Sequence, residues 1–246
     1  MKTSSAVALA LLVAFCVTSI RAQRGGTRRL DRNKNPSEEV RQSYERRQVD
    51  GLKITIYQPG SNGLRPVHPG QSFTNGDRIK VRFESNFDGY IYVVNLTPGG
   101  ETRLLFPWPS SRRNHVRAGQ AYDIPNAGEF RFNNEPGLEV LQIVMSRSQV
   151  YFLEEILDRA PLKARNILLD KEVVKKLMNL AGKPRRLKGS GIATQTESKR
   201  TEGLQTRILT LESRKEGSIV VLAGAKGPAR FGPGEVSIFE IRLNHY

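Results

Sequence analysis

The chain is poor in the residue types on which most catalytic and metal sites depend. It has 246 residues but only one cysteine, three histidines and one tryptophan. The cysteine, Cys16, lies in the stretch 1–22, which we expect to be removed on export. A mature chain without cysteine has no disulfides, thiolate nucleophiles or cysteine-ligated metal sites. Its stability must come from its own hydrophobic core, which about 220 residues can supply.

Long apolar runs are scarce as well. The run from Ala6 to Val17 is too short to span a bilayer, and Arg21 follows it closely. Lys2 before the run and the small residue Ala22 after it complete the pattern of a secretory signal peptide. We therefore expect cleavage after Ala22, no transmembrane segment in the mature chain, and a periplasmic or extracellular location.

No arrangement of side chains typical of catalysis, metal binding or cofactor binding is present in the sequence. His68, His115 and His245 are not spaced with each other or with acidic residues as metal ligands are, so we expect surface or loop positions. The adjacent Glu154 and Glu155 would point about 100° apart on a helix, and we expect them on a solvated face. We predict no catalytic residue, no metal ligand and no cofactor.

An alternative stays open, a hydrolase whose acidic groups come from distant parts of the sequence. Distant carboxylates, such as Asp77, Asp88 or Asp123, would then have to converge in one pocket. Only the fold decides whether they do.

The positive charge is concentrated in one segment. The formal net charge is +15, yet residues 51–158 carry 11 basic and 11 acidic groups. Residues 159–207 carry 13 basic and 4 acidic groups, a net +9. Such a segment can bind polyanions or anionic surfaces through charge alone. It has no interleaved aromatic residues for base stacking, and an exported protein seldom meets nucleic acid, so an anionic envelope component is the preferred partner.

A ladder of alternating apolar and polar residues runs from 75 to 147, interrupted by turns rich in Gly, Pro, Asn and Asp. Ile79, Val81 and Phe83, for example, share one face of a strand whose other face is charged. The stretch 90–96 is apolar on both faces, which predicts a central strand. Short strands at intervals of about 8–12 residues are typical of a β-sandwich or barrel.

The chain is predicted to contain one β-domain, residues 51–246, behind the signal peptide and a flexible polar leader over 23–50. A basic, partly helical insertion interrupts this domain over about 150–206. Strands are expected to resume at 207–211, 219–223 and 236–243. In the last of them the apolar spacing changes between Ile238 and Phe239, which predicts either a bulge or a strand buried on both faces.

Within the insertion, helices are expected at 150–159 and 171–181. Asp170 is a good N-cap for the second helix and Gly182 a good C-cap. Residues 185–206 are rich in Arg, Lys, Gly, Ser and Thr, so we expect a mobile stretch there.

Several segments together resemble one known family. They are Asn75-Gly76-Asp77-Arg78, the run from Ser85 to Asn95, Leu104-Leu105-Phe106-Pro107, the runs from Asn114 to Gln120 and from Tyr122 to Pro125, Glu135-Pro136-Gly137, and the closing run from Glu240 to His245. Over about residues 51–150 and the last strand, the chain resembles domain of unknown function family 4384. The resemblance implies a bacterial, exported domain with an immunoglobulin-like antiparallel β-sandwich. It carries over no catalytic or ligand-binding residue.

Two parts of the chain are candidate partner-binding sites. The loop 106–115 combines the only tryptophan with prolines and a basic doublet, and Trp and Arg are enriched at binding hot spots. The basic segment 159–207 is the second candidate. The candidate residues are Trp108, Arg112, Arg113, Lys175, Lys176, Arg185, Arg186 and Lys188. The simpler interpretations are a tryptophan that covers one end of the core and a solvated basic surface.

We therefore expect an exported, non-enzymatic β-domain that acts as an interaction or cell-envelope-associated module. Its partner would be a protein or an anionic component of the envelope. The alternative function is binding of an anionic surface or polyanion through residues 159–207.

Overall fold

The computed structural model describes residues 50–68, 70–111, 113–133, 135–181, 230–232 and 234–246, and the backbone of the strands between Pro184 and Ala223. All of them belong to the unit formed by Asn35–Tyr246. The predicted signal peptide and all of the predicted leader except Asp50 lie outside the described residues.

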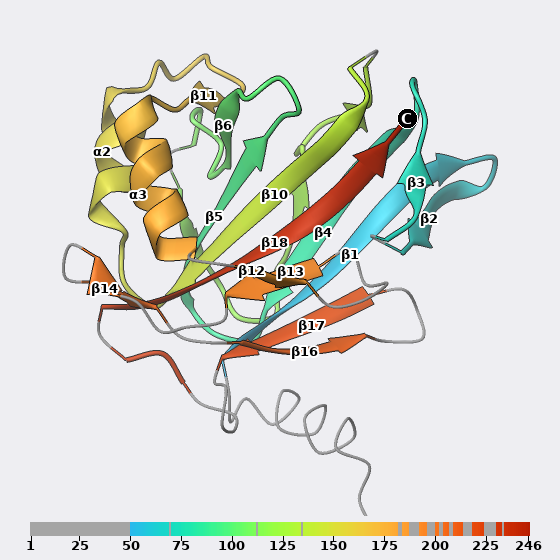
Figure 1. The fold of residues 1–246 in the computed structure, drawn as a ribbon. Coiled ribbons are helices and arrows are strands. Elements are labelled where there is room, and N and C mark those ends of the chain that lie inside the picture. Colours follow the sequence, from blue (N-terminus) through green and yellow to red (C-terminus); the bar gives the residue numbers. More distant parts are fainter. Residues whose placement is uncertain are drawn as a thin grey trace, which may run out of the picture. The chain divides into compact units, whose positions relative to one another are not determined.

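Two β-sheets form the framework of the described part (Figure 1). The first sheet has the order β16 (Leu209–Ser213), β17 (Ser218–Ala223), β1 (Gly51–Gly60), β4 (Arg78–Ser85) and β8 (Ala121–Ile124), with β2 (Gly63–Val67) paired to β1 and β9 (Phe130–Arg131) paired to β4. The second sheet has the order β11 (Ile167–Leu168), β6 (Thr102–Phe106), β5 (Gly89–Leu96), β10 (Gly137–Ser146), β18 (Glu235–His245), β13 (Ile192–Gln195) and β12 (Pro184–Arg186).

Four short strands complete the second sheet. They are β3 (Ser72–Phe73) and β15 (Leu204–Thr206) on β18, β7 (His115–Val116) on β5, and β14 (Arg200–Thr201) on β15. Of all these pairings, only those of β3 and β15 with β18 are parallel.

The larger hydrophobic cluster fills the space between the two sheets. Ile79, Val81 and Phe83 of β4 are at most 2% exposed, because strand alternation points all three to the same side. They belong to one cluster with Leu141 and Ile143 of β10 in the opposite sheet. The predicted two-sheet β-sandwich is therefore confirmed.

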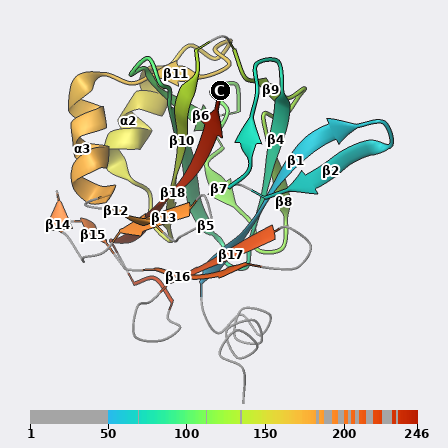
Figure 2. The same ribbon diagram turned by 45° about the vertical axis from the view of Figure 1, so that its right-hand side comes forward.

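Two helices cover the other face of the second sheet, α2 (Tyr151–Arg159) and α3 (Lys171–Ala181) (Figure 2). Tyr92 and Val94 of β5 pack there with Leu153 of α2 and Leu177 of α3. Strand β5 is thus buried on both faces, as its continuous apolar stretch predicted. None of the helices in the described part of the chain could span a membrane.

Both predicted helices are confirmed. The Asp170 carboxylate accepts a hydrogen bond from the Val173 backbone N–H at 2.9 Å, so Asp170 caps α3 as expected. Leu177 and Leu180 on the same helix are almost fully buried, while Lys175 is exposed. The predicted C-cap, Gly182, lies outside the described residues.

The structure of β18 decides between the two interpretations of its apolar spacing, a bulge or a strand buried on both faces. Its register with β10 is continuous from Val236 to His245, so the strand has no bulge against this partner. Val236 and Ile238 belong to the cluster under the helices, whereas Phe239 and Ile241 belong to the cluster between the sheets. The second interpretation, a strand buried on both faces, is therefore correct.

Part of the interval 185–206, for which a mobile stretch is predicted, forms strands. Strands β12, β13, β14 and β15 lie between Pro184 and Thr206. Strand β13 pairs with Ile241, Glu240 and Phe239 of β18. The backbone of β18 offers hydrogen bonds to an extended segment beside it, which explains this pairing.

A buried ion pair joins three distant segments at one end of the sheets. Asp50, with a side chain 2% exposed, accepts two hydrogen bonds from the Arg147 guanidinium at 2.7 Å each. The same carboxylate accepts a hydrogen bond from the Phe231 backbone N–H at 2.8 Å. Asp50 therefore connects the starts of β1 and β18 to the end of β10.

Removing Arg147 should destabilise the fold strongly. Arg147→Met leaves the Asp50 carboxylate buried without its cation, and we expect the free energy of unfolding in urea to fall by about 3 kcal/mol. The control is Arg82→Met, which breaks the Arg82–Asp123 pair, with an Arg82 side chain 43% exposed. It should cost about 1 kcal/mol or less. Equal losses would show that burial of Asp50 does not matter.

Candidate functional site

One side of the sandwich is closed by loops rather than by strand pairing. In the described residues, β8 and β9 form the edge of the first sheet there, and β11 and β6 the edge of the second. Loops from both sheets surround a groove of about 870 Å³, which we call the outer groove. Its lining residues are Leu105, Trp108, Ser110, Ile124, Pro125, Asn126, Ala127, Gly128, Glu129, Phe130, Leu162, Lys163, Ala164, Arg165 and Asn166.

Trp108 has two structural roles at this groove. Its half-buried ring packs edge-on against Phe106, with ring centroids 5.1 Å apart, and so joins the core between the sheets. A turn in which the Ser111 backbone N–H donates to the Trp108 carbonyl at 3.0 Å holds the loop. Trp108 therefore covers the open side of the core, as the simpler interpretation had it, and also lines the outer groove.

The opposite wall of the outer groove is basic. Lys163 and Arg165 lie on the connection between α2 and β11, and both are exposed. Neither forms a salt bridge within the described part of the chain. The wall is held in place by Arg103 of β6, which donates a hydrogen bond to the Asn166 side chain at 3.0 Å. Glu129 is the acidic residue of the lining.

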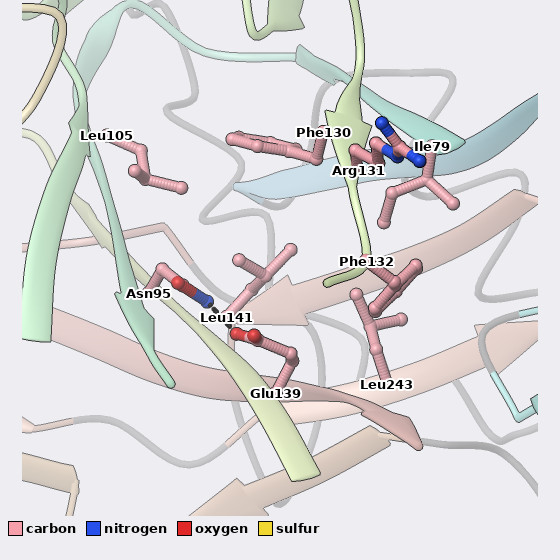
Figure 3. A pocket seen from close by; sticks show the side chains of 9 residues that line it. All are labelled: Ile79, Asn95, Leu105, Phe130, Arg131, Phe132, Glu139, Leu141 and Leu243. Carbon is pink, nitrogen blue, oxygen red and sulfur yellow. Dashed lines mark hydrogen bonds between the residues drawn. The ribbon is translucent and has the colours of Figure 1, made fainter. Parts of the chain in front are cut away.

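A second hollow, the inner pocket, is shown in Figure 3. Its volume is about 130 Å³, and its lining residues are Ile79, Asn95, Leu105, Phe130, Arg131, Phe132, Glu139, Leu141 and Leu243. Leu105 and Phe130 line both hollows, so these two side chains separate them.

The inner pocket has one acidic group in a largely apolar lining. The Asn95 amide donates a hydrogen bond to the Glu139 carboxylate at 2.7 Å, and Figure 3 shows the two side chains meeting at one side of the pocket. No described Lys, Arg or His forms a salt bridge with Glu139. Burial raises the pKa of Glu139 to about 7, and the negative charge of Glu135 adds to the effect.

Sequence reasoning missed this pair, although the sequence contains a signal for it. Glu139 has the same strand parity as Leu141, Ile143 and Met145 of β10, which point between the sheets. A carboxylate on the apolar face of a strand needs a partner or a changed protonation state. Asn95 could not be found in this way, because its partner comes from a strand 44 positions away.

The predicted partner-binding residues do not form one cluster in the described part of the chain. Trp108 lines the outer groove and Arg113 is exposed beyond it in the same loop. On α3, Lys175 is exposed and the Lys176 ammonium lies 5.8 Å from the centre of the Phe152 ring. For Arg185 and Arg186 only the backbone in β12 is described, and Arg112 and Lys188 lie outside the described residues.

One histidine prediction was wrong. His68 and His115 are exposed, as expected, but His245 is 2% exposed, because it is the last residue of β18 and its ring packs against the core. Its ring lies 5.1 Å from Phe132, and neither ring nitrogen has a hydrogen-bond partner among the described residues. No group of three or more potential metal ligands occurs among the described residues.

The carboxylates of the hydrolase alternative do not converge. Asp77 and Asp88 lie beyond opposite ends of β4, an eight-residue strand about 25 Å long. Asp77 accepts hydrogen bonds from Thr74, and Asp88 accepts one from the Ala118 backbone N–H at 2.9 Å. Asp123 is bound to Arg82. A shared pocket for these three groups is therefore ruled out by the fold.

Glu154 was wrongly predicted on a solvated face. Its carboxylate accepts hydrogen bonds from the Tyr92 hydroxyl and the Asn114 amide, and the same Tyr92 hydroxyl accepts one from the Val150 backbone N–H at 3.0 Å. Burial raises the pKa of Glu154. The network fixes α2 to β5 and to the end of the Trp108 loop, while the neighbouring Glu155 is exposed as expected.

The chain is therefore a two-sheet, mainly antiparallel β protein with helices on one face of its second sheet. Its candidate site, the outer groove, lies largely on loops. Residues 72–149 match the model of the family described as Domain of unknown function (DUF4384). The predicted resemblance to this family is confirmed over that segment. The segment starts with β3 and ends two residues before the first residue of α2. Comparison with curated proteins and with solved structures gave no match.

The raised pKa of Glu139 should make stability depend on pH. Between about pH 4.5 and pH 7 the folded chain binds a proton at Glu139 that the unfolded chain does not, so this group lowers stability as pH rises. Glutamine does not ionise, so Glu139→Gln removes this loss of folding stability at high pH. Because the side chain is only half-buried, we expect a gain of about 1 kcal/mol at pH 8 and almost none at pH 4.

Urea unfolding at the two pH values measures this difference, and Glu135→Gln serves as control. Glu135 is exposed and does not line the pocket, so its variant should change stability by less than about 0.5 kcal/mol. A Glu139→Gln variant that is less stable at pH 8 than at pH 4, relative to the parent, would contradict the assignment.

Proposed function

We propose that this protein is an exported, non-catalytic binding module of the cell envelope, and that its partner binds in the outer groove. The observation that carries the proposal is the groove itself. It brings the only tryptophan and two exposed basic residues, Lys163 and Arg165, to one hollow on two packed sheets. Loops on a rigid scaffold are common sites of binding, and Trp and Arg are enriched at hot spots.

The chemistry of the groove favours an acidic peptide segment of a partner protein. Lys163 and Arg165 have no acidic partner within the described residues. Both positive charges could therefore attract the carboxylate of a ligand without first breaking a salt bridge. Arg can bind a carboxylate through two hydrogen bonds. Trp108 and Leu162, the latter 57% exposed, offer apolar surface to neighbouring side chains of the peptide.

Binding of a labelled acidic peptide tests the groove. The probe is a fluorescein-labelled peptide of alternating glutamate and leucine, followed by fluorescence anisotropy at about 0.15 M salt. We expect the double variant Lys163→Glu and Arg165→Glu to bind at least tenfold more weakly than the parent chain, since two attractive charges become repulsive. A probe of alternating lysine and leucine should not bind to the parent chain.

A matched variant separates the groove from overall charge. Lys171→Glu with Lys175→Glu makes the same change in net charge on α3, outside the lining of the groove. It should weaken binding by less than about threefold, because neither residue lines the groove and the Debye length at about 0.15 M salt is only about 8 Å. Equal losses in the two double variants would reject the groove and favour the alternative, binding of anionic surfaces by the whole basic segment 159–207.

Export is tested separately from binding. Residues 1–22 have the features of a cleavable signal, so their fusion to a β-lactamase that lacks its own signal should give ampicillin resistance to a bacterial host. Replacing Leu11 and Leu12 by Asp interrupts the apolar run and should abolish resistance. Resistance that persists in this variant would contradict the signal peptide.

A further inference from the structure

We propose that the inner pocket binds an alkylammonium group, with the ammonium at the Glu139 carboxylate and the alkyl stem against Phe130, Phe132 and Leu141. This proposal goes beyond the outer groove and does not depend on a partner binding there. The ligand class is a primary amine on a short apolar chain. Its source is either a free amine or the lysine side chain of a peptide.

The geometry of the pocket supports this class of ligand. The Asn95 amide occupies one Glu139 oxygen, Oε2, and the other oxygen accepts no hydrogen bond from the described residues. An ammonium has three hydrogen-bond donors and would bind this other oxygen. Its positive charge would also balance the negative charge of the partly buried carboxylate. The rest of the lining near the carboxylate is mainly aliphatic and aromatic, which suits an unbranched alkyl stem.

The size of the pocket limits the ligand to a few atoms. A buried apolar cavity of about 150 Å³ holds benzene, which has six heavy atoms. The inner pocket, at about 130 Å³, is therefore matched to an amine of about five heavy atoms. n-Butylamine has this size and reproduces the end of a lysine side chain.

Other charged or titratable side chains lie on the elements around Glu139. Arg131 of β9 lies across the pocket from Glu139 (Figure 3), but it is exposed, so water screens its charge. Arg103 of β6, opposite Asn95 in the sheet, is held by Glu101 and Asn166. Glu135, before β10, adds negative charge, and His245 lies two positions beyond Leu243 on β18.

The experiment is a titration of the full chain with n-butylamine, followed by NMR through the side-chain amide signal of Asn95. We expect saturable shifts of this signal at pH 8 and about tenfold weaker binding at pH 6. At those pH values a carboxyl with a pKa of about 7 is roughly 90% and 10% ionised, whereas the amine stays charged. 1-Butanol, equal in size but neutral, should bind at least tenfold more weakly at pH 8.

Variants decide whether Glu139 carries the effect. Glu139→Gln should lose the preference for the amine over the alcohol and also the pH dependence, whereas Glu135→Gln should keep both. A pH dependence that survives in Glu139→Gln would assign it to another group, with His245 the first candidate, and would overturn the proposal. Equal affinity for amine and alcohol in the parent chain would also overturn it, because the pocket would then be a simple apolar cavity.

The source of the amine is distinguished in the same titration. Nα-acetyl-lysine amide that binds like n-butylamine would identify a peptide lysine, and binding of n-butylamine alone would identify a free amine; both results support the pocket. The double variant Lys163→Glu and Arg165→Glu should leave binding of n-butylamine unchanged, since neither residue lines the inner pocket. Failure of the groove and failure of the pocket are therefore observed independently.

Discussion

The central strands of the second sheet are apolar on both faces, and much of the remaining architecture follows from this constraint. Strands β5, β10 and β18 each contribute side chains to both hydrophobic clusters. A sheet of this kind cannot leave either face in water, so one face requires the first sheet and the other requires α2 and α3. The helices are thus a third layer of the domain, not an appendage to a sandwich.

The same constraint creates the candidate site. Sheets that twist over one another separate at their sides, and the strands that could close the gap here, β8, β9, β6 and β11, are short. Apolar side chains between the sheets would face water there unless loops covered them. Trp108 supplies part of that cover, and the hollows left between the covering loops are the outer groove and the inner pocket.

Much of the fold could be predicted because its rules are local. Alternation placed Ile79, Val81 and Phe83 on a buried face, the continuous apolar stretch placed β5 in the centre, and Asp170 marked the start of α3. The prediction failed where the outcome depends on a distant partner. Glu154 is held by groups 40 and 62 positions away, and no local pattern contains them.

The candidate site was predictable only in part, for the same reason. Trp108 could be singled out because it is the only tryptophan and lies between prolines. The basic wall was predicted as general charge, and only the packing of the α2–β11 connection beside Trp108 selects Lys163 and Arg165 from the 13 basic residues of that segment. The inner pocket is lined from six strands, β4, β5, β6, β9, β10 and β18, and Asn95 and Glu139 meet in it only because β5 pairs with β10.

The two hollows differ in which part of the chain builds them. Eight of the nine residues that line the inner pocket lie within 72–149, the segment that matches the family, and only Leu243 lies outside it. The basic wall of the outer groove lies entirely beyond that segment, in 162–166. Leu105 and Phe130 stand between the hollows and contact both. A ligand that displaces either side chain would change the shape of both sites at once, so this pair gives the two sites a physical means of coupling.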